Sequence, residues 1–177
     1  ATAISVAAIL LTFSIVNGFQ TEISQKIYSF WGQVQISAVS GSALENKPEV
    51  VQQIKTLPAV QKVAAYLNQP MVLAKALEIE GLNAKGIEEV TTTPQVSKGR
   101  RLSNDPQSIV KEIMVSKTMA DKLQIKLGDQ VRLYFFQNGR AQERKLTVVG
   151  LFHTGIEEYD SKNVFVDLKL LQQLIQS

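Results

Sequence analysis

Apolar residues fill the first part of the chain without interruption by charge. Residues 1–21 hold no charged side chain, and the first charged residue is Glu22. At about 1.5 Å per residue, a helix of this length nearly matches a bilayer core of about 30 Å. We therefore predict the end of a transmembrane helix in a piece of a longer membrane protein. A buried core helix and a cleaved signal peptide are alternatives, and the second is disfavoured because a basic segment and a small-residue cleavage site are missing.

A helical period continues beyond this apolar stretch. Asn17-Gly18 would normally mark the end of a helix. However, apolar residues recur at i+4 through this point, with polar residues on the other face: Phe19, Ile23, Ile27 and Trp31. We predict one continuous helix over residues 1–31, which leaves the membrane as an amphipathic stalk and ends at Gly32.

Residues 33–58 show a strand pattern followed by a helix pattern. Apolar and polar residues alternate over 33–38 (QVQISA), which predicts a strand. Pro48 is expected at the first position of a helix, and Pro58 is expected to stop it.

The next part of the chain holds two apolar runs and a loose segment. We predict strands over 60–67 and 71–79, joined by a turn at 68–70, although the second run also fits a helix. Residues 81–107 read as a linker or an exposed loop. Strands and helices in this order predict an α+β fold with helices on one face of a sheet.

Regular patterns return at residue 109. A strand over 109–115 precedes Ser116, which is expected to cap a short helix through Lys122. Near the end of the chain, a strand over 164–166 precedes Asp167, which is expected to cap a helix with an inward-facing apolar side: Leu168, Leu171, Leu174 and Ile175.

A β-hairpin is the clearest signal in the second half of the chain. Two strand-like runs, 131–136 and 144–151, flank Asn138-Gly139, a pair that favours a type I′ turn. We therefore predict two antiparallel strands, with Leu146, Val148 and Leu151 on their buried side.

Composition excludes several classes of protein. The chain has no cysteine and one histidine, so disulfides, thiol chemistry and cysteine-based zinc sites are excluded. Residues 91–150 carry a net charge of +6 and the remaining residues −3. This basic segment is either a solvated face or a contact for lipid phosphates or an acidic partner. Nucleic acid is not expected, because no binding motif is present.

No catalytic constellation is visible in the sequence. His153 has Ser161 nearby, but no G-x-S-x-G elbow surrounds this serine. Three acidic residues lie close together, at Glu157, Glu158 and Asp160. They either bind a cation or, more in keeping with their spacing, cap a loop or bridge subdomains. We therefore predict that the chain is not an enzyme.

Two separated stretches together resemble a known family. The first is Ser14–Gln20, which holds N-G-F after the apolar run, and the second is Val148–Asp160, which ends in T-G-x-x-E-Y-D before a strand. The resemblance is to lipoprotein-releasing ABC transporter permeases of the LolC/LolE type. More distantly, the chain is similar to macrolide-exporter (MacB-like) and cell-division (FtsX-like) permeases with the same extracytoplasmic core domain. The family-motif loop comprises Thr154, Gly155, Glu158, Tyr159 and Asp160.

The resemblance implies a particular organisation of the chain. Residues 1–31 would be the end of the first transmembrane helix and its stalk. Residues 32–90 and 151–177 would form a mixed α/β, porter-like subdomain. Residues 91–150 would form an inserted, mainly β, sabre-like subdomain that is basic.

The resemblance also implies a function and a set of partners. Such permeases lie in the bacterial inner membrane, with this domain in the periplasm, and release lipoproteins from that membrane. The implied partners are a second permease copy or paralogue, a cytoplasmic ABC ATPase, the lipoprotein cargo and a periplasmic carrier. No cofactor is expected in this chain, because a separate ATPase subunit binds ATP. The alternative is a MacB-like exporter or an FtsX-like regulatory permease that contacts a periplasmic partner without moving lipoprotein.

Two sets of residues become candidate contacts on this basis. The apolar side of the stalk would contact acyl chains or a partner: Phe19, Ile23, Ile27 and Trp31. The hairpin tip would contact a periplasmic partner: Phe136, Gln137, Asn138, Gly139 and Arg140. In the permease that recruits the carrier, this hairpin is a long hook with proline. Here it is short and without proline, so a non-recruiting partner and a carrier-independent homologue both remain open.

Overall fold

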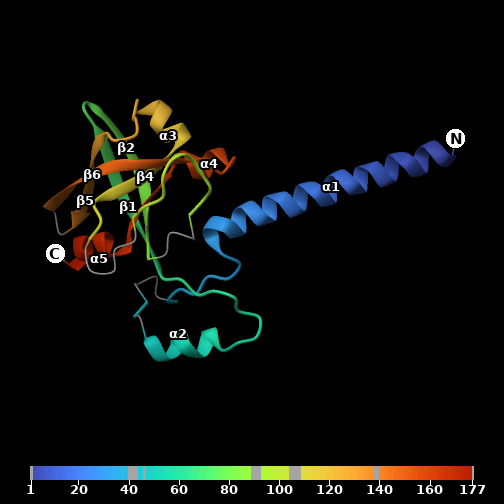
Figure 1. Cartoon of the computed structure of the whole chain (residues 1–177), viewed down its shortest axis with the longest axis horizontal. Coiled ribbons are helices and arrows are strands. Elements are labelled where there is room, and N and C mark those ends of the chain that lie inside the picture. The colour runs from blue at the N-terminus through green and yellow to red at the C-terminus, as the bar shows by residue number, and fades with distance from the viewer. Residues whose placement is uncertain are drawn as a thin grey trace. The chain divides into compact units, whose positions relative to one another are not determined.

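The computed structural model of the chain describes residues 2–39, 44–45, 47–88, 93–103, 109–137 and 140–176. Five helices and seven strands lie in these ranges (Figure 1). The chain divides into two compact units, residues 1–35 and 36–177. The predicted mixed α+β class, preceded by an apolar helix, is confirmed.

Helix α1 forms the first unit and covers Thr2–Trp31 without a break at Asn17-Gly18. It ends as predicted at Gly32, whose φ of +77° is readily adopted only by glycine and whose N–H donates to the Tyr28 carbonyl at 3.1 Å. Residues Thr2–Ser24 are long and apolar enough to cross a membrane, as judged by length and composition.

The described residues of the second unit that precede Tyr66 contain helix α2, Pro48–Lys55, and no strand. Pro48 occupies the first turn as predicted, because proline lacks the N–H that this position leaves without a helical partner. The strand predicted over 33–38 is wrong. Val34 and Ile36 are 83% and 60% exposed. Alternation alone does not make a strand, since a strand also needs a neighbour to accept its hydrogen bonds.

Seven strands form one sheet in the rest of the second unit. Their bounds are β1 Tyr66–Lys75, β2 Glu78–Ile87, β3 Val96–Gly99, β4 Glu112–Ser116, β5 Gln130–Gln137, β6 Arg140–Phe152 and β7 Asn163–Asp167. The strand order is β3-β6-β4-β7-β2-β1-β5, and β5 also pairs with β6. This last pairing joins six strands into a ring, which we call the closed sheet.

The long strand β6 makes the closure possible. Residues 140–147 pair antiparallel with β5, and residues 147–152 pair parallel with β4. Strand β3 adds to the far end of β6, opposite residues 150–152. The predicted hairpin is thereby confirmed, since Gln137 pairs with Arg140 and leaves a two-residue loop. Asn138 and Gly139 themselves lie outside the described residues.

Helices α3 and α4 connect strands of the sheet, and helix α5 follows the last strand. Helix α3, Lys117–Lys122, is capped by the Ser116 hydroxyl, which accepts a hydrogen bond from the Met119 N–H at 3.0 Å. Helix α4 covers Glu157–Asp160, and α5 covers Leu168–Gln176. The Asp167 carboxylate caps α5 by accepting from the Lys169 N–H at 2.8 Å. Both predicted caps are confirmed. Figure 1 shows α3 and α4 at one end of the closed sheet and α5 at the other.

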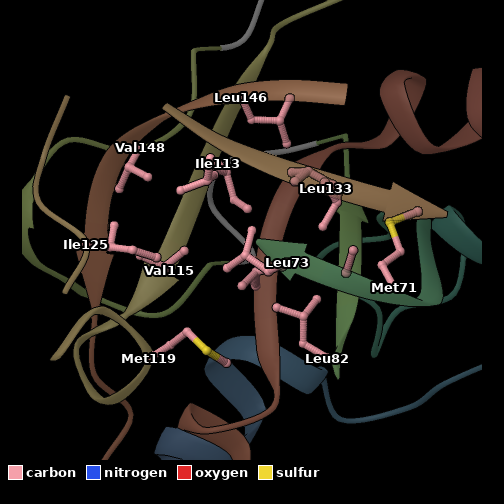
Figure 2. Close-up of a cluster of buried hydrophobic side chains, with 14 of the residues drawn as sticks. Met71, Leu73, Leu82, Ile113, Val115, Met119, Ile125, Leu133, Leu146 and Val148 are labelled. Atoms are coloured by element: carbon pink, nitrogen blue, oxygen red, sulfur yellow. The ribbon is translucent and has the colours of Figure 1, made fainter. Parts of the chain in front are cut away.

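One hydrophobic core fills the closed sheet, with side chains from most strands pointing toward one another (Figure 2). It unites Leu73 and Leu82 with Ile113, Leu133 and Leu146, which come from both predicted subdomains. Strand β4 also pairs with β7, and β5 pairs with β1. Residues 91–150 therefore share one sheet and one core with residues 32–90 and 151–177. Local sequence patterns could not show this, because they do not indicate which strands pair. The porter-like and sabre-like layers stay predictions.

The turn predicted at 68–70 is wrong, because β1 runs straight through Pro70. Asn83, the partner of Pro70 on β2, directs its N–H toward β7 and donates to the Lys162 carbonyl at 2.7 Å. Pro70 therefore lies at a non-hydrogen-bonded position of the ladder, where the missing N–H costs nothing. The turn lies instead at Ala76–Leu77.

The loose segment predicted over 81–107 is also partly wrong. Residues 81–87 belong to β2, and 96–99 form β3. Gly86 is necessary here, because a Cβ atom would lie 2.9 Å from Cδ1 of Leu171 and 3.1 Å from Cα of Leu168. A glycine that permits close packing of a helix on a strand looks like a turn residue in the sequence.

Candidate functional site

The family-motif loop forms a hydrogen-bonded cluster at the end of β6. The Asp160 carboxylate is fully buried and accepts from the Thr154 N–H at 3.1 Å and from the Thr154 hydroxyl at 2.7 Å. Nδ1 of His153 lies 2.8 Å from the same carboxylate. The Ser116 hydroxyl donates to the Asp160 carbonyl, so the cluster also holds the start of α3.

The remaining motif residues have different surroundings. Tyr159 is buried, whereas Glu158 and Gly155 are exposed. Gly155 has a φ of +80°, which favours glycine at this bend. Within the described ranges, no three His, Cys, Asp or Glu residues are placed to hold a metal ion. Of the two predicted roles for the acidic residues, Asp160 takes the loop-capping one.

The predicted stalk contacts lie along α1. Phe19, Ile23 and Trp31 are exposed, and Ile27 is partly exposed. A spacing of four residues rotates about 40° per step around a helix, so these residues form a slanted apolar stripe. All four residues of this stripe belong to α1.

The structure describes only part of the predicted hairpin tip. Phe136, at the end of β5, is 65% exposed. Gln137 and Arg140 close the ladder, while Asn138 and Gly139 lie outside the described residues. The aromatic ring of Phe136 therefore presents apolar surface to the solvent at the end of the strand.

A shallow basic groove beside this hairpin was not predicted. Its lining residues come from β5, β6 and the residue before β4: Lys111, Gln130, Glu143, Arg144, Lys145 and Thr147. On the same hairpin Arg132 pairs with Lys145 across the strands, and its Nε lies 3.3 Å from the Glu143 carboxylate. Like charges on facing residues are unfavourable unless an anion compensates them. The register set by Asn138-Gly139 could have revealed this pair.

A second charge cluster ties α3 to the sheet. The Glu80 carboxylate on β2 contacts Nζ of Lys122 at 2.7 Å and Nζ of Lys162 at 3.4 Å. The hydrogen bond from Lys122 is the main reason that the pKa of Glu80 lies below its usual value. These residues are far apart in the sequence, so no local pattern could have indicated the cluster.

Lys85 is an unusual lysine on β2, because only 7% of its surface is exposed. Its Nζ lies 5.2 Å from the ring centre of Tyr66 and 6.0 Å from that of Phe165. Burial lowers the pKa of Lys85 to about 8. The aromatic faces favour the charged form, and desolvation outweighs them.

The model of the MacB-like periplasmic core domain family matches residues 1–177 of this chain. The chain belongs to that family. The matched region includes α1 and the whole closed sheet. The family is one of transporter permease domains and not a catalytic family. The chain is therefore the periplasmic core domain of an ABC-type membrane permease.

Individual relatives agree with this assignment. The chain is 22% identical over 169 residues to the lipoprotein-releasing system transmembrane protein LolC of Neisseria meningitidis serogroup B, which covers 90% of this chain. It spans only 40% of that relative's length.

Two solved structures share the fold. The periplasmic region of MacB from Actinobacillus actinomycetemcomitans matches 88% of this chain and 74% of its own, with a TM-score of 0.57 and 14% identity. The extracellular domain of the noncanonic ABC-type transporter YknZ from Gram-positive bacteria matches 73% and 66%, with a TM-score of 0.55 and 22% identity.

Proposed function

We propose that this chain is part of a permease that couples ATP-driven motion to the release of lipoproteins from the bacterial inner membrane. The observation that carries this proposal is the unbroken helix α1, which extends seven residues past the apolar span Thr2–Ser24. The similarity to LolC over most of the chain supports lipoprotein as the cargo. ATP is bound by a separate cytoplasmic ATPase, and this chain needs no cofactor.

The mechanism follows from the stiffness of a helix. Each backbone hydrogen bond in α1 resists bending, so motion of the apolar span is transmitted to the residues beyond it. Seven residues at about 1.5 Å each extend the helix by about 10 Å. ATPase closure beneath the membrane would therefore displace the stalk together with the span.

The stalk stripe is the proposed contact for acyl chains. Phe19, Ile23, Ile27 and Trp31 present apolar surface at the point where the helix leaves the membrane. Burial of acyl methylene groups against such surface is favourable by about 0.8 kcal/mol each. The tip residues Phe136, Gln137, Asn138, Gly139 and Arg140 are the proposed contact for a periplasmic partner, such as a carrier.

Photocrosslinking in membranes tests this proposal. A photoreactive amino acid replaces Ile23, Ile27 or Phe136 in the full permease, together with its ATPase. Adducts between position 23 or 27 and an acylated lipoprotein are expected. An absence of lipoprotein adducts in every nucleotide state would contradict the proposed cargo.

A pair of variants tests the stalk stripe by activity. Ile23→Asp combined with Ile27→Asp should abolish lipoprotein release while ATP hydrolysis persists, because charge on the stripe disfavours acyl chains. Leu77→Asp is the matched control, since Leu77 is exposed and lies in the β1–β2 turn. Unchanged release in the double variant would rule out the stripe as the acyl contact.

A second function is a MacB-like exporter or an FtsX-like regulatory permease. The similarity in fold to the MacB periplasmic region supports it. Adducts from Phe136 to a periplasmic protein, without any lipoprotein adduct from the stalk, would favour this second function.

A further inference from the structure

Strand β6 has a neighbour on both sides over only part of its length. From Thr147 onward it pairs with β4, whereas residues 141–145 pair with β5 alone in the described ranges. The Thr147 N–H donates to the Lys111 carbonyl at 3.0 Å, and the ladder between β6 and the β4 side begins with this bond. Residues 141–145 therefore have one side without a neighbouring strand.

The geometry of the hairpin determines which backbone groups face this side. In a hairpin with a two-residue loop, the residues that flank the loop exchange hydrogen bonds, and so does every second pair after them. Ala141, Glu143 and Lys145 lie between these pairs, so their N–H and C=O groups point away from β5. Thr147 follows in the same series, and its N–H does point away from β5, toward Lys111. We call Ala141, Glu143 and Lys145 the open edge of β6.

The open edge offers unpaired backbone groups to a further strand. In the part of the chain that the structure describes, no backbone group outside the hairpin bonds to these three residues. The carbonyl of Glu143 accepts from the Arg144 guanidinium at 3.0 Å. Backbone N–H and C=O groups at a strand edge can pair with an extended segment of another chain.

Basic side chains surround the open edge. Lys111, Arg144 and Lys145 line the groove beside it, and Arg132 lies opposite Lys145 on β5. Glu143 also lines the groove, and its carboxylate lies 3.3 Å from Nε of Arg132. Four basic side chains and one carboxylate leave a net charge of +3. The groove therefore favours an acidic ligand.

The end of the open edge nearest the hairpin tip is apolar. Ala141 pairs with Phe136, whose side chain is 65% exposed. Alternate residues of a strand share one face, so Phe136 lies on the face of β5 that also carries Arg132. A strand added to the open edge would meet aromatic surface near the tip and positive charge near β4.

We propose that the open edge of β6 binds an extended, acidic segment of a periplasmic protein as an additional β-strand. The edge presents both donors and acceptors, which a peptide backbone matches, whereas a phosphate group offers acceptors alone. A second copy of the same edge is disfavoured, because both edges carry positive charge. The Arg144 guanidinium can exchange the Glu143 carbonyl for a carboxylate of the ligand, with which its hydrogen bonds are stronger.

The inference rests on the proposed function in one respect, namely that this hairpin faces a periplasmic partner. It adds the chemistry of the segment that binds, with acidic residues toward β4 and an apolar residue toward Phe136. The lipoprotein cargo has no part in it.

Peptide binding to the full-length permease, purified with its ATPase in detergent, tests the inference. The probe is a fluorescently labelled peptide of alternating glutamate and valine with both ends capped, and fluorescence anisotropy measures its binding. The parent permease should bind this peptide. A peptide of alternating lysine and valine should not bind, and neither should the acidic peptide with a methyl group on every backbone nitrogen. Equal binding of the methylated peptide would overturn the inference, because charge alone would then explain the attraction.

Two substitutions separate charge from backbone pairing. Lys145→Glu should weaken binding about threefold to thirtyfold, because repulsion replaces attraction between exposed charges. Lys98→Glu makes the same change at an exposed position of β3 and should leave binding unchanged. Ala141→Pro should weaken binding about twofold to tenfold, since it removes one outward N–H and no charge. Ala141→Ser keeps this N–H and is its control, and circular dichroism verifies that each variant is folded.

Photocrosslinking in native membranes identifies what occupies the open edge. A photoreactive amino acid replaces Ala141 in the permease with its ATPase, and adducts are mapped by mass spectrometry. Adducts to an acidic segment of a periplasmic protein are expected. Adducts confined to a second copy of the permease, or to another segment of the same polypeptide, would overturn the inference.

The peptide assay provides two further ways to reject the inference. They are an absence of acidic-peptide binding to the parent permease, and displacement of the peptide by inorganic phosphate at constant ionic strength. Because no lipoprotein is present, this assay is separate from the test of the cargo. Peptide binding as expected, together with no lipoprotein adducts from the stalk, would contradict the proposed cargo and support the open edge.

Discussion

The carboxylate of Asp160 accepts hydrogen bonds from both the N–H and the hydroxyl of Thr154, at 3.1 and 2.7 Å. This pair closes the loop between β6 and α4 around a fully buried carboxylate. The motif thus fixes the loop after β6, the longest strand, and this loop leads through α4 to β7 in the middle of the sheet.

Removal of this carboxylate should weaken the fold strongly. Asp160→Ala leaves the Thr154 N–H and hydroxyl buried without an acceptor, which costs about 2–4 kcal/mol of unfolding free energy. Chemical denaturation of the chain in detergent, followed by near-UV circular dichroism, measures the loss. Thr154→Val should cost less, because it removes one of the donors. Additive effects of the two substitutions would contradict a direct interaction.

Gly86 should be intolerant of a side chain. Gly86→Ala places a methyl group 2.9 Å from Cδ1 of Leu171 and 3.1 Å from Cα of Leu168. Because the backbone of α5 must shift, we expect destabilisation of about 1–3 kcal/mol. Gly81→Ala is the matched control on the same strand, where no heavy atom lies within 4 Å of the new Cβ. Equal effects of the two substitutions in a denaturation experiment would show that α5 does not press on β2.

Lys85 should make the fold more stable at alkaline pH. Its folded-state pKa of about 8 lies below the unfolded value of 10.5. Between these values the unfolded chain binds more protons, so the unfolding free energy rises with pH. The rise amounts to about 3 kcal/mol, because one pKa unit corresponds to about 1.4 kcal/mol. Lys85→Met should be more stable at neutral pH and lack this rise. Parallel curves for Lys85→Met and the parent chain would contradict a desolvated Lys85.

Glu80 should contribute to stability in the opposite pH range. Its pKa is lowered mainly by the hydrogen bond from Lys122, so its contribution is present above the unfolded pKa of 4.5 and is lost as pH falls below it. The contribution should be less than about 1 kcal/mol, because both lysines are more than half exposed. Comparison of Glu80→Gln with the parent chain between pH 6 and about 3 measures it. A larger difference at pH 3 than at pH 6 would be inconsistent with this pairing.

Local signals predicted the features that depend on neighbours in the sequence. Ser116 and Asp167 cap their helices, Pro48 begins α2, and the Asn138-Gly139 pair sits between the strands of a hairpin. Each of these results depends on a few consecutive residues, whose side chains satisfy or remove a backbone hydrogen bond nearby.

Other predictions failed where a distant partner decides the outcome. Residues 33–38 alternate but have no strand beside them in the described ranges, whereas Pro70 and Gly86 lie within strands because of what β7 and α5 place next to them. The cluster of Glu80 with Lys122 and Lys162 joins residues that no periodicity connects.

Local patterns in the sequence were enough to predict the apolar helix through Trp31, the helix caps, the hairpin and the family. Short-range hydrogen bonding and helical periodicity carry this information along the chain. The folded structure was needed to show that β4 pairs with β7 and β5 with β1 in one closed sheet, with one core shared by both predicted subdomains. Strand pairing depends on which buried surfaces fit together across the whole chain, and no short stretch of sequence shows this fit.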